Sequence, residues 1–230
     1  RRTLEWMQVL RTILAGEPVS FHGEFLDLEV APPRIAAEAR RVPPFYFGGL
    51  SPAAREVAAQ GADVYLTWPD TVAATAEVVE DLRGRAASHG RSLRLGFRAH
   101  VIVRETEGEA RAAARHLVAA LDAKAGEAIR ARSLDTGSAG VARQAELRGE
   151  GDDEAYAEPH LWTGVGRARS GAGAAIVGDP DQVRATLDAY RDVGIDAFIL
   201  SGYPHLRECE RFARLVLDDL PHRPLSHRSG

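Results

Sequence analysis

Apolar positions along the chain change repeatedly between a spacing of three or four residues, typical of helices, and short continuous runs, typical of buried strands. The continuous runs predict strands over 45–49, 63–68, 95–103 and 197–202, and the run over 174–178 leads into a helix start. The helical spacing predicts helices over 4–14, 52–61, 71–88, 106–121, 180–193 and 206–217. Strands that alternate with helices of this length indicate parallel βα units.

Two segments depart from this alternation. Residues 19–28 alternate between apolar and polar around a glycine, which predicts a short hairpin. Between residues 122 and 159 the periodicity is lost, and Gly, Ser, Arg and acidic residues become frequent. A stretch of this length favours a functional lid with some helix of its own over a simple connection.

An open doubly wound sheet and a (β/α)₈ barrel both fit the βα pattern. Only about four strong strands are present, whereas a complete barrel has eight. The chain also begins at Arg1 directly inside a helical pattern. A barrel therefore requires a missing upstream half, and we expect a single, N-terminally truncated domain over 1–230.

Composition limits the classes of protein and partner. The 230 residues are 45% hydrophobic and 27% charged, which is typical of a soluble globular domain. A net charge of -4, with arginines scattered among carboxylates, provides no basic surface for nucleic acid. Cys209 is the single cysteine, and no apolar run approaches the ~18 to 20 residues that span a bilayer. We expect a cytoplasmic protein without nucleic-acid or membrane partners.

Arg98 and His100 lie two residues apart in the strand predicted over 95–103. In an extended strand this spacing points both side chains to the same face. Residues 101–103 are all apolar, as in a parallel strand covered on both sides, so the pair is expected to face a barrel interior or a cleft. The alternative is structural, with His100 bonded to a neighbouring carbonyl in the core and Arg98 in an ion pair.

Glycine and aromatic residues follow other predicted strands, at the ends where parallel barrels place their chemistry. Gly48 and Gly49 precede the helix start at Ser51, where backbone N–H groups would meet an anion such as a phosphate; alternatively, they only form a tight turn. Trp68 would form a wall for substrate or pack against the following helix. Tyr203 would reach a ligand or plug the barrel rim.

Residues 164–173 form a glycine-rich loop that contains Arg167 and Arg169. No strong strand precedes the loop, and its spacing differs from a dinucleotide-binding fingerprint. A mobile loop that brings Arg169 onto a sulfonate, phosphate or carboxylate is one interpretation, because a guanidinium grips such groups with two bonds. A flexible, solvated loop is the other. Zinc-ligand spacing is absent, so we expect no metal.

Several blocks of the sequence together resemble the alkanesulfonate monooxygenases of the bacterial luciferase-like, flavin-dependent superfamily. The blocks are 45–49, 64–68, 98–106, 161–166, 170–178 and 200–206. They occur in the family's order, and His-Val-Ile-Val-Arg-Glu-Thr and Ser-Gly-Tyr-Pro-His are the most specific. The resemblance implies an α/β fold, a (β/α)₈ TIM barrel, of which this chain is the C-terminal half from about strand five to strand eight. It also implies a lid insertion over 122–173.

The resemblance implies roles for individual residues. The implied catalytic residues are Arg98, His100, Arg169 and Tyr203, the cofactor-binding residues are Gly48, Gly49 and Ser51, and the substrate-binding residue is Trp68. The family commonly has serines directly after the Gly-Gly pair, where this chain has Leu50, Ser51 and Pro52.

The implied reaction has two components. A partner flavin reductase supplies reduced FMN, and the enzyme uses oxygen to convert an alkanesulfonate into an aldehyde and sulfite. A homo-oligomer is also implied. One alternative is a hydride-transferring oxidoreductase of the same superfamily that uses the deazaflavin F420. Another is a non-catalytic flavin-binding fragment.

Overall fold

The computed structural model describes residues 1–122, 124, 126–128, 137–167 and 173–222. The strands are β1 (Val19–His22), β2 (Asp27–Val30), β3 (Tyr46–Phe47), β4 (Val64–Thr67), β5 (Arg94–Val103), β6 (Tyr156–Glu158), β7 (Leu161–Trp162), β8 (Ala175–Gly178) and β9 (Ala197–Ser201). The helices are α1 (Arg2–Leu14), α2 (Arg34–Ala39), α3 (Pro52–Gly61), α4 (Val72–Ser88), α5 (Glu107–Ala119), α7 (Ala139–Gly149), α8 (Pro180–Asp192) and α9 (His205–Leu215), with short 3-10 helices η1 (Gly164–Arg167) and η2 (Leu217–Asp219).

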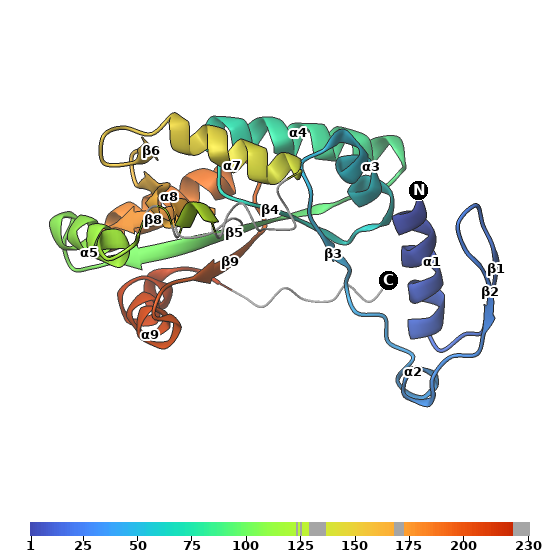
Figure 1. Cartoon of the computed structure of the whole chain (residues 1–230). Helices are drawn as coiled ribbons and strands as arrows, with labels where there is room; N and C mark the ends of the chain where they lie inside the picture. The colour runs from blue at the N-terminus through green and yellow to red at the C-terminus, as the bar shows by residue number, and fades with distance from the viewer. Residues whose placement is uncertain (123, 125, 129–136, 168–172, 223–230) are drawn as a thin grey trace.

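The long strand β5 is the centre of the sheet (Figure 1). It pairs in parallel with β4 along 94–97, with β9 along 96–100 and with β8 along 100–103. β3 pairs in parallel with β4. The strands that follow the βα pattern are thus all parallel, and the terminal strands of the curved sheet are β3, β6 and β9. This confirms the predicted α/β class and the interpretation as part of a barrel.

Local sequence signals explain where the helices begin. Ser51, Thr71, Thr106 and Asp179 each cap a helix, with a side-chain oxygen that accepts a hydrogen bond from a backbone N–H in the first turn. Thr106 and Glu109 form the predicted capping box at the start of α5. Because these caps are encoded by adjacent residues, the predicted helix starts agree closely with the structure.

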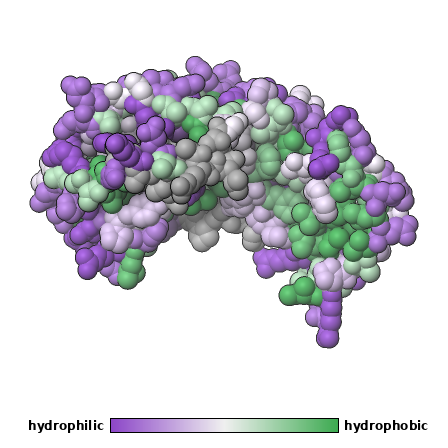
Figure 2. All heavy atoms as spheres, in the orientation of Figure 1, coloured by the Kyte–Doolittle hydropathy of each residue, from purple (hydrophilic) through white to green (hydrophobic). Residues whose placement is uncertain are grey.

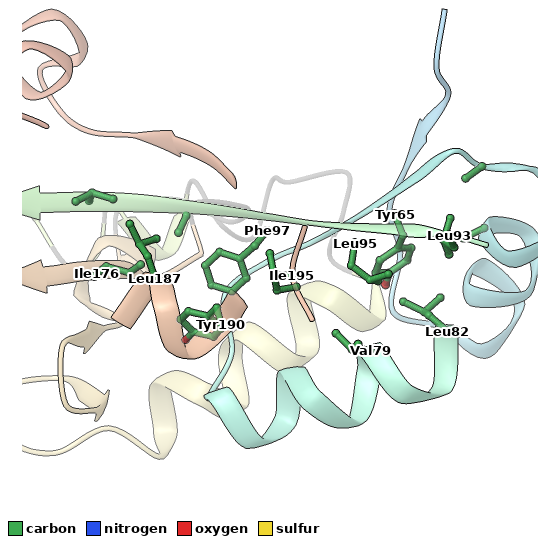
Figure 3. Packing of buried hydrophobic residues seen from close by; sticks show 14 of the residues in the cluster. Tyr65, Val79, Leu82, Leu93, Leu95, Phe97, Ile176, Leu187, Tyr190 and Ile195 are labelled. Atoms are coloured by element: carbon green, nitrogen blue, oxygen red, sulfur yellow. The ribbon is translucent and has the colours of Figure 1, made fainter. Parts of the chain in front are cut away.

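The core lies between β5 and the helices on one side of it. The odd-numbered residues of β5 from Leu95 to Val103 belong to this core, together with side chains of α4, α8 and α9. Phe97 packs against Tyr190 of α8, with ring centroids 4.2 Å apart, as Figure 3 shows. Full burial of one such aromatic side chain contributes about 1.5 to 3 kcal/mol. The even-numbered residues of β5, Arg98 and His100 among them, consequently point to the opposite face, as predicted.

The segment after α5 contains more regular structure than its sequence pattern indicates. Its described part holds α7, the antiparallel pair β6 and β7, and η1. β7 also pairs antiparallel with β8, which joins this hairpin to the main sheet. Strands of two or three residues produce no readable alternation, so these two were missed.

α1, the predicted hairpin β1–β2 and α2 form the N-terminal part of the chain, next to α3. Figure 2 shows apolar residues gathered on the side of the molecule that carries these elements. The large apolar side chains that are exposed there are those of Trp6, Leu10, Phe25, Val30 and Ile35. None of the helices in the described ranges is both long and apolar enough to cross a membrane.

Candidate functional site

A cavity of about 330 Å³ lies at the C-terminal ends of β3 and β4. Its walls come from residues 46–50, which include the turn after β3, and from residues 65–68 at the end of β4. Arg98 of β5 and the start of α7, with Ser138 and Gly140, complete the lining. Parallel βα folds bind ligands at this end of their strands.

Arg98 brings a positive charge to an otherwise mainly apolar wall. Its side chain is partly buried. Within the described ranges, no carboxylate forms an ion pair with it. This geometry disfavours the structural ion pair that the sequence left open. A partly desolvated guanidinium in a cavity suits a ligand with an anionic group, because the ligand then supplies the missing charge.

Gly48 and Gly49 shape the turn that closes one side of the cavity. A Cβ on Gly48 would lie 2.8 Å from the main-chain oxygen of Leu66, and Gly49 has a φ of +149°. Both positions therefore require glycine for steric reasons, as the tight-turn interpretation expects. The Tyr65 hydroxyl donates a hydrogen bond of 2.9 Å to the Gly49 carbonyl, and burial raises the pKa of Tyr65 to about 12. Tyr65 stays protonated at neutral pH and fixes the turn.

Trp68 forms the wall between β4 and α7. Its side chain lines the cavity, and a Cβ on Gly140 would lie 3.4 Å from the Trp68 ring. The absence of a side chain at Gly140 therefore lets the first turn of α7 come close to the indole. Trp68 packs against α7, which follows much later in the sequence, as well as facing the cavity.

Polar contacts hold α7 against the turn after β4. The Arg143 guanidinium donates two hydrogen bonds to the Asp70 carboxylate, at 2.6 and 2.8 Å. The amide nitrogen of Gln144, a buried residue, donates to the main-chain oxygen of Pro69 at 2.7 Å. Both residues lie on α7 close to Gly140, so these bonds set the position of the cavity wall.

His100 and Tyr203 lie in a second group, beyond Arg98 along β5. His100 is 4% exposed, and its Nδ1 atom is 2.9 Å from the Ser201 hydroxyl oxygen. The Tyr203 ring lies 5.1 Å from the His100 ring and 4.8 Å from the His205 ring, measured between centroids. The group therefore combines a histidine with a hydroxyl partner and with the Tyr203 ring, which is tilted against His100 and meets His205 edge-on.

The structure brings together part of the set of site residues that the sequence predicted. Gly48, Gly49, Trp68 and Arg98 line one cavity, whereas His100 and Tyr203 contact each other outside its lining. The Ser51 hydroxyl accepts from the Ala54 N–H as the cap of α3 and is not part of that lining. Arg169 lies outside the described residues. The roles of all these residues in catalysis or binding stay predictions.

Sequence reasoning missed four residues that build these two groups, namely Tyr65, Ser138, Gly140 and Ser201. Tyr65 reads as an ordinary core residue of a buried strand. Ser138 and Gly140 fall in the stretch without periodicity. Ser201 ends a strand within a block that carries the resemblance, but its contact with His100 depends on the pairing of β5 with β9.

The cavity fits part of a flavin. Its volume is at the lower end of the range of about 300 to 1,000 Å³ for small-molecule sites. Aromatic residues, Trp68 among them, suit a flat ring, and Arg98 suits an anionic group. Gly48 and Gly49 line the cavity without side chains, so a ligand on that side would meet their backbone.

Comparisons with known proteins agree with these features. Residues 1–197 match the family model described as luciferase-like monooxygenase. The sulfoquinovose monooxygenases of Novosphingobium aromaticivorans and Agrobacterium fabrum are 56% and 45% identical to this chain, over 98% and 100% of its length. The matches cover 62% and 60% of those two proteins, so the chain spans less than two thirds of these curated relatives.

Solved structures share the fold at low sequence identity. DmoA from Hyphomicrobium sulfonivorans has a TM-score of 0.64 at 17% identity, over 88% of this chain and 46% of its own. EDTA monooxygenase from Chelativorans sp. BNC1 has a TM-score of 0.60 at 19% identity, over 88% of this chain and 50% of its own. Both matches extend over most of this chain but only about half of the solved chains.

Proposed function

The chain belongs to the luciferase-like monooxygenase family, and on this premise we propose that it forms part of a flavin-dependent monooxygenase that releases sulfite from a sulfonate. The observation that carries the proposal is Arg98, a cation in an aromatic cavity with no carboxylate partner in the described part of the chain. A sulfonate supplies the missing negative charge, and its oxygens accept both hydrogen bonds of a guanidinium.

Sulfoquinovose, a sulfonated sugar, is the substrate that we favour. The name of the two relatives described above supports this choice, because both are sulfoquinovose monooxygenases. The cavity wall also offers hydroxyl groups from Tyr46 and Ser138, which suit a ligand with several hydroxyls. The Ser138 side chain makes no capping bond to α7, so its hydroxyl is not committed to the helix. A simple alkanesulfonate, the substrate expected from the sequence, would leave these groups unused.

Each group of residues has a part in the proposed reaction. Reduced FMN, when bound, supplies the electrons that activate oxygen, and a separate flavin reductase provides it. The turn at Gly48 and Gly49 accepts the flat cofactor, Trp68 excludes water from one side, and Arg98 holds the sulfonate and offsets its charge. His100 holds or moves a proton, because the ordinary pKa of an imidazole lies near neutral pH.

Sulfite release tests this proposal. We expect the intact protein that contains this chain to release sulfite from sulfoquinovose only when reduced FMN and oxygen are both present. Octanesulfonate should give a kcat/KM at least about tenfold lower, since the Tyr46 and Ser138 hydroxyls then lack the partners that the sugar provides. Equal sulfite release without oxygen would contradict a monooxygenase. Equal kcat/KM for the two sulfonates would contradict only the choice of substrate.

A further inference from the structure

Ser201 contacts His100 across two neighbouring parallel strands. Ser201 is the last residue of β9 and stands directly opposite His100 of β5 in the register of the pair. Its hydroxyl oxygen lies 2.9 Å from His100 Nδ1. Within the described ranges, the structure gives this hydroxyl no second hydrogen-bond partner. His100 Nδ1 is therefore the protein acceptor available to the Ser201 proton.

We propose that Ser201 is a positioning residue that donates its hydroxyl proton to His100 Nδ1 and so holds the neutral imidazole as the Nε2–H tautomer. A neutral imidazole carries one ring proton, so Nε2 must carry it when Nδ1 accepts a hydrogen bond. In this neutral state the ring donates a hydrogen bond through Nε2. The inference deepens the proposed function and rests on it for the role of His100 in the reaction.

The same bond selects the orientation of the ring. His100 is 4% exposed and lies 5.1 Å from the Tyr203 ring, so packing restricts the plane of the imidazole. Packing alone distinguishes poorly between two orientations that differ by a half-turn, because they exchange Nδ1 with a ring carbon of similar size. The Ser201 hydroxyl favours the orientation that presents Nδ1, since a carbon there would leave the hydroxyl unpaired.

A hydroxyl at this position also suits a histidine that changes its protonation state. When the imidazole is protonated, Nδ1 carries an N–H, and the Ser201 oxygen can turn its own proton away and accept that bond. A carboxylate in the same place would strongly favour the charged imidazole. Ser201 therefore keeps His100 in place in both states and defines the tautomer only in the neutral one.

Nitrogen NMR tests the tautomer without any need for turnover. The intact protein is labelled with ¹⁵N-histidine, and a His100→Gln variant identifies the His100 signals. Above the pH at which His100 titrates, we expect a protonated Nε2 and an unprotonated Nδ1. Ser201→Ala should give averaged shifts of the two tautomers, and Ser201→Thr, which keeps a hydroxyl on a strand, should restore the original pattern. Ser88→Ala removes a hydroxyl that bonds to the Arg85 carbonyl on α4 and should change nothing.

Kinetics with sulfoquinovose, reduced FMN and oxygen test the positioning role. We expect Ser201→Ala to lower kcat about tenfold with KM changed less than about twofold, the effect of losing one hydrogen bond that orients a reacting group. Ser201→Thr should recover most of kcat.

A protonated Nδ1 in the original protein, or a spectrum that Ser201→Ala leaves unchanged, would overturn the assignment of the tautomer. An unchanged kcat in Ser201→Ala would overturn the positioning role. Absence of sulfite from the original protein would count against the proposed function and leave the NMR result to decide the tautomer.

Discussion

Arg98 and His100 illustrate how far a residue pattern alone determines a site. Their spacing predicted a common face, and the structure agrees, because the residues between and around them pack into the core on the other face. The spacing did not predict that the two side chains join different groups of residues. Arg98 reaches the cavity through the position of β4 and α7, and His100 meets Ser201 through β9. Those contacts depend on segments that lie far away in the sequence.

Replacement of Arg98 tests its assignment to the ligand. We expect Arg98→Ala to reduce kcat/KM at least about 100-fold, the scale of losing one preorganised charge contact, with little change in melting temperature. Arg98→Lys should recover only part of the loss, because an ammonium cannot form the bidentate pair of hydrogen bonds that a guanidinium makes with a sulfonate. Both sulfite release and thermal unfolding are measured on each variant.

Arg94 offers a matched control for Arg98. It lies on the same strand and face, four residues earlier, and does not line the cavity. We expect Arg94→Ala to retain kcat/KM. A loss of about 3 to 5 kcal/mol in stability for Arg98→Ala, with normal turnover per folded molecule, would indicate a buried structural charge instead.

At the scale of elements, the βα units were predictable and the inserted segment was not. Helix starts follow from capping residues such as Thr106 and Asp179, which act on their own neighbours. The hairpin of β6 and β7 is stabilised differently, since Leu161 and Trp162 are buried by pairing with β8 and by packing on other segments. Nothing within two or three residues of sequence encodes such an arrangement. The described part of the segment predicted as a lid is thus partly anchored to the sheet.

The contact between α7 and the turn after β4 gives an element-level prediction. We expect Arg143→Ala to increase amide hydrogen exchange in 139–149 about tenfold or more, because the Asp70 carboxylate loses two charged hydrogen bonds. Arg34→Ala, which removes an exposed ion pair with Glu38 on α2, should leave exchange in 139–149 unchanged. Exchange in 139–149 that is identical in Arg143→Ala and the original protein would show that other contacts hold α7.

At the scale of the whole molecule, two terminal strands of the sheet, β3 and β9, leave an edge open in the part of the chain that the structure describes. Among the described strands, β3 pairs with β4 alone and β9 with β5 alone, while the third terminal strand, β6, pairs with β7. Tyr46 on β3 and Ile199 on β9 are 43% and 42% exposed, so the edges present apolar side chains as well as unpaired backbone groups. The predicted fold class required more strands than the sequence contains, and this inference from strand count agrees with the coverage of the relatives, of which the chain spans 62% and 60%.

The free edges lead to a prediction about the 230-residue chain on its own. Exposed strand edges pair readily with other chains, so we expect the isolated chain to self-associate at micromolar concentration and to bind reduced FMN at least about tenfold more weakly than the intact protein. Light scattering after size exclusion measures self-association, and anaerobic fluorescence titration measures the binding of reduced FMN.

Charged substitutions at the two edges, Tyr46→Lys and Ile199→Lys, should reduce self-association because they make edge pairing unfavourable. Ile35→Lys removes an exposed apolar side chain from α2, away from both edges, and should have a smaller effect. If Ile35→Lys prevents association and the edge variants do not, the apolar surface around α1 and α2 must cause it, and the edges of the sheet must be protected by their own twist or by the neighbouring segments.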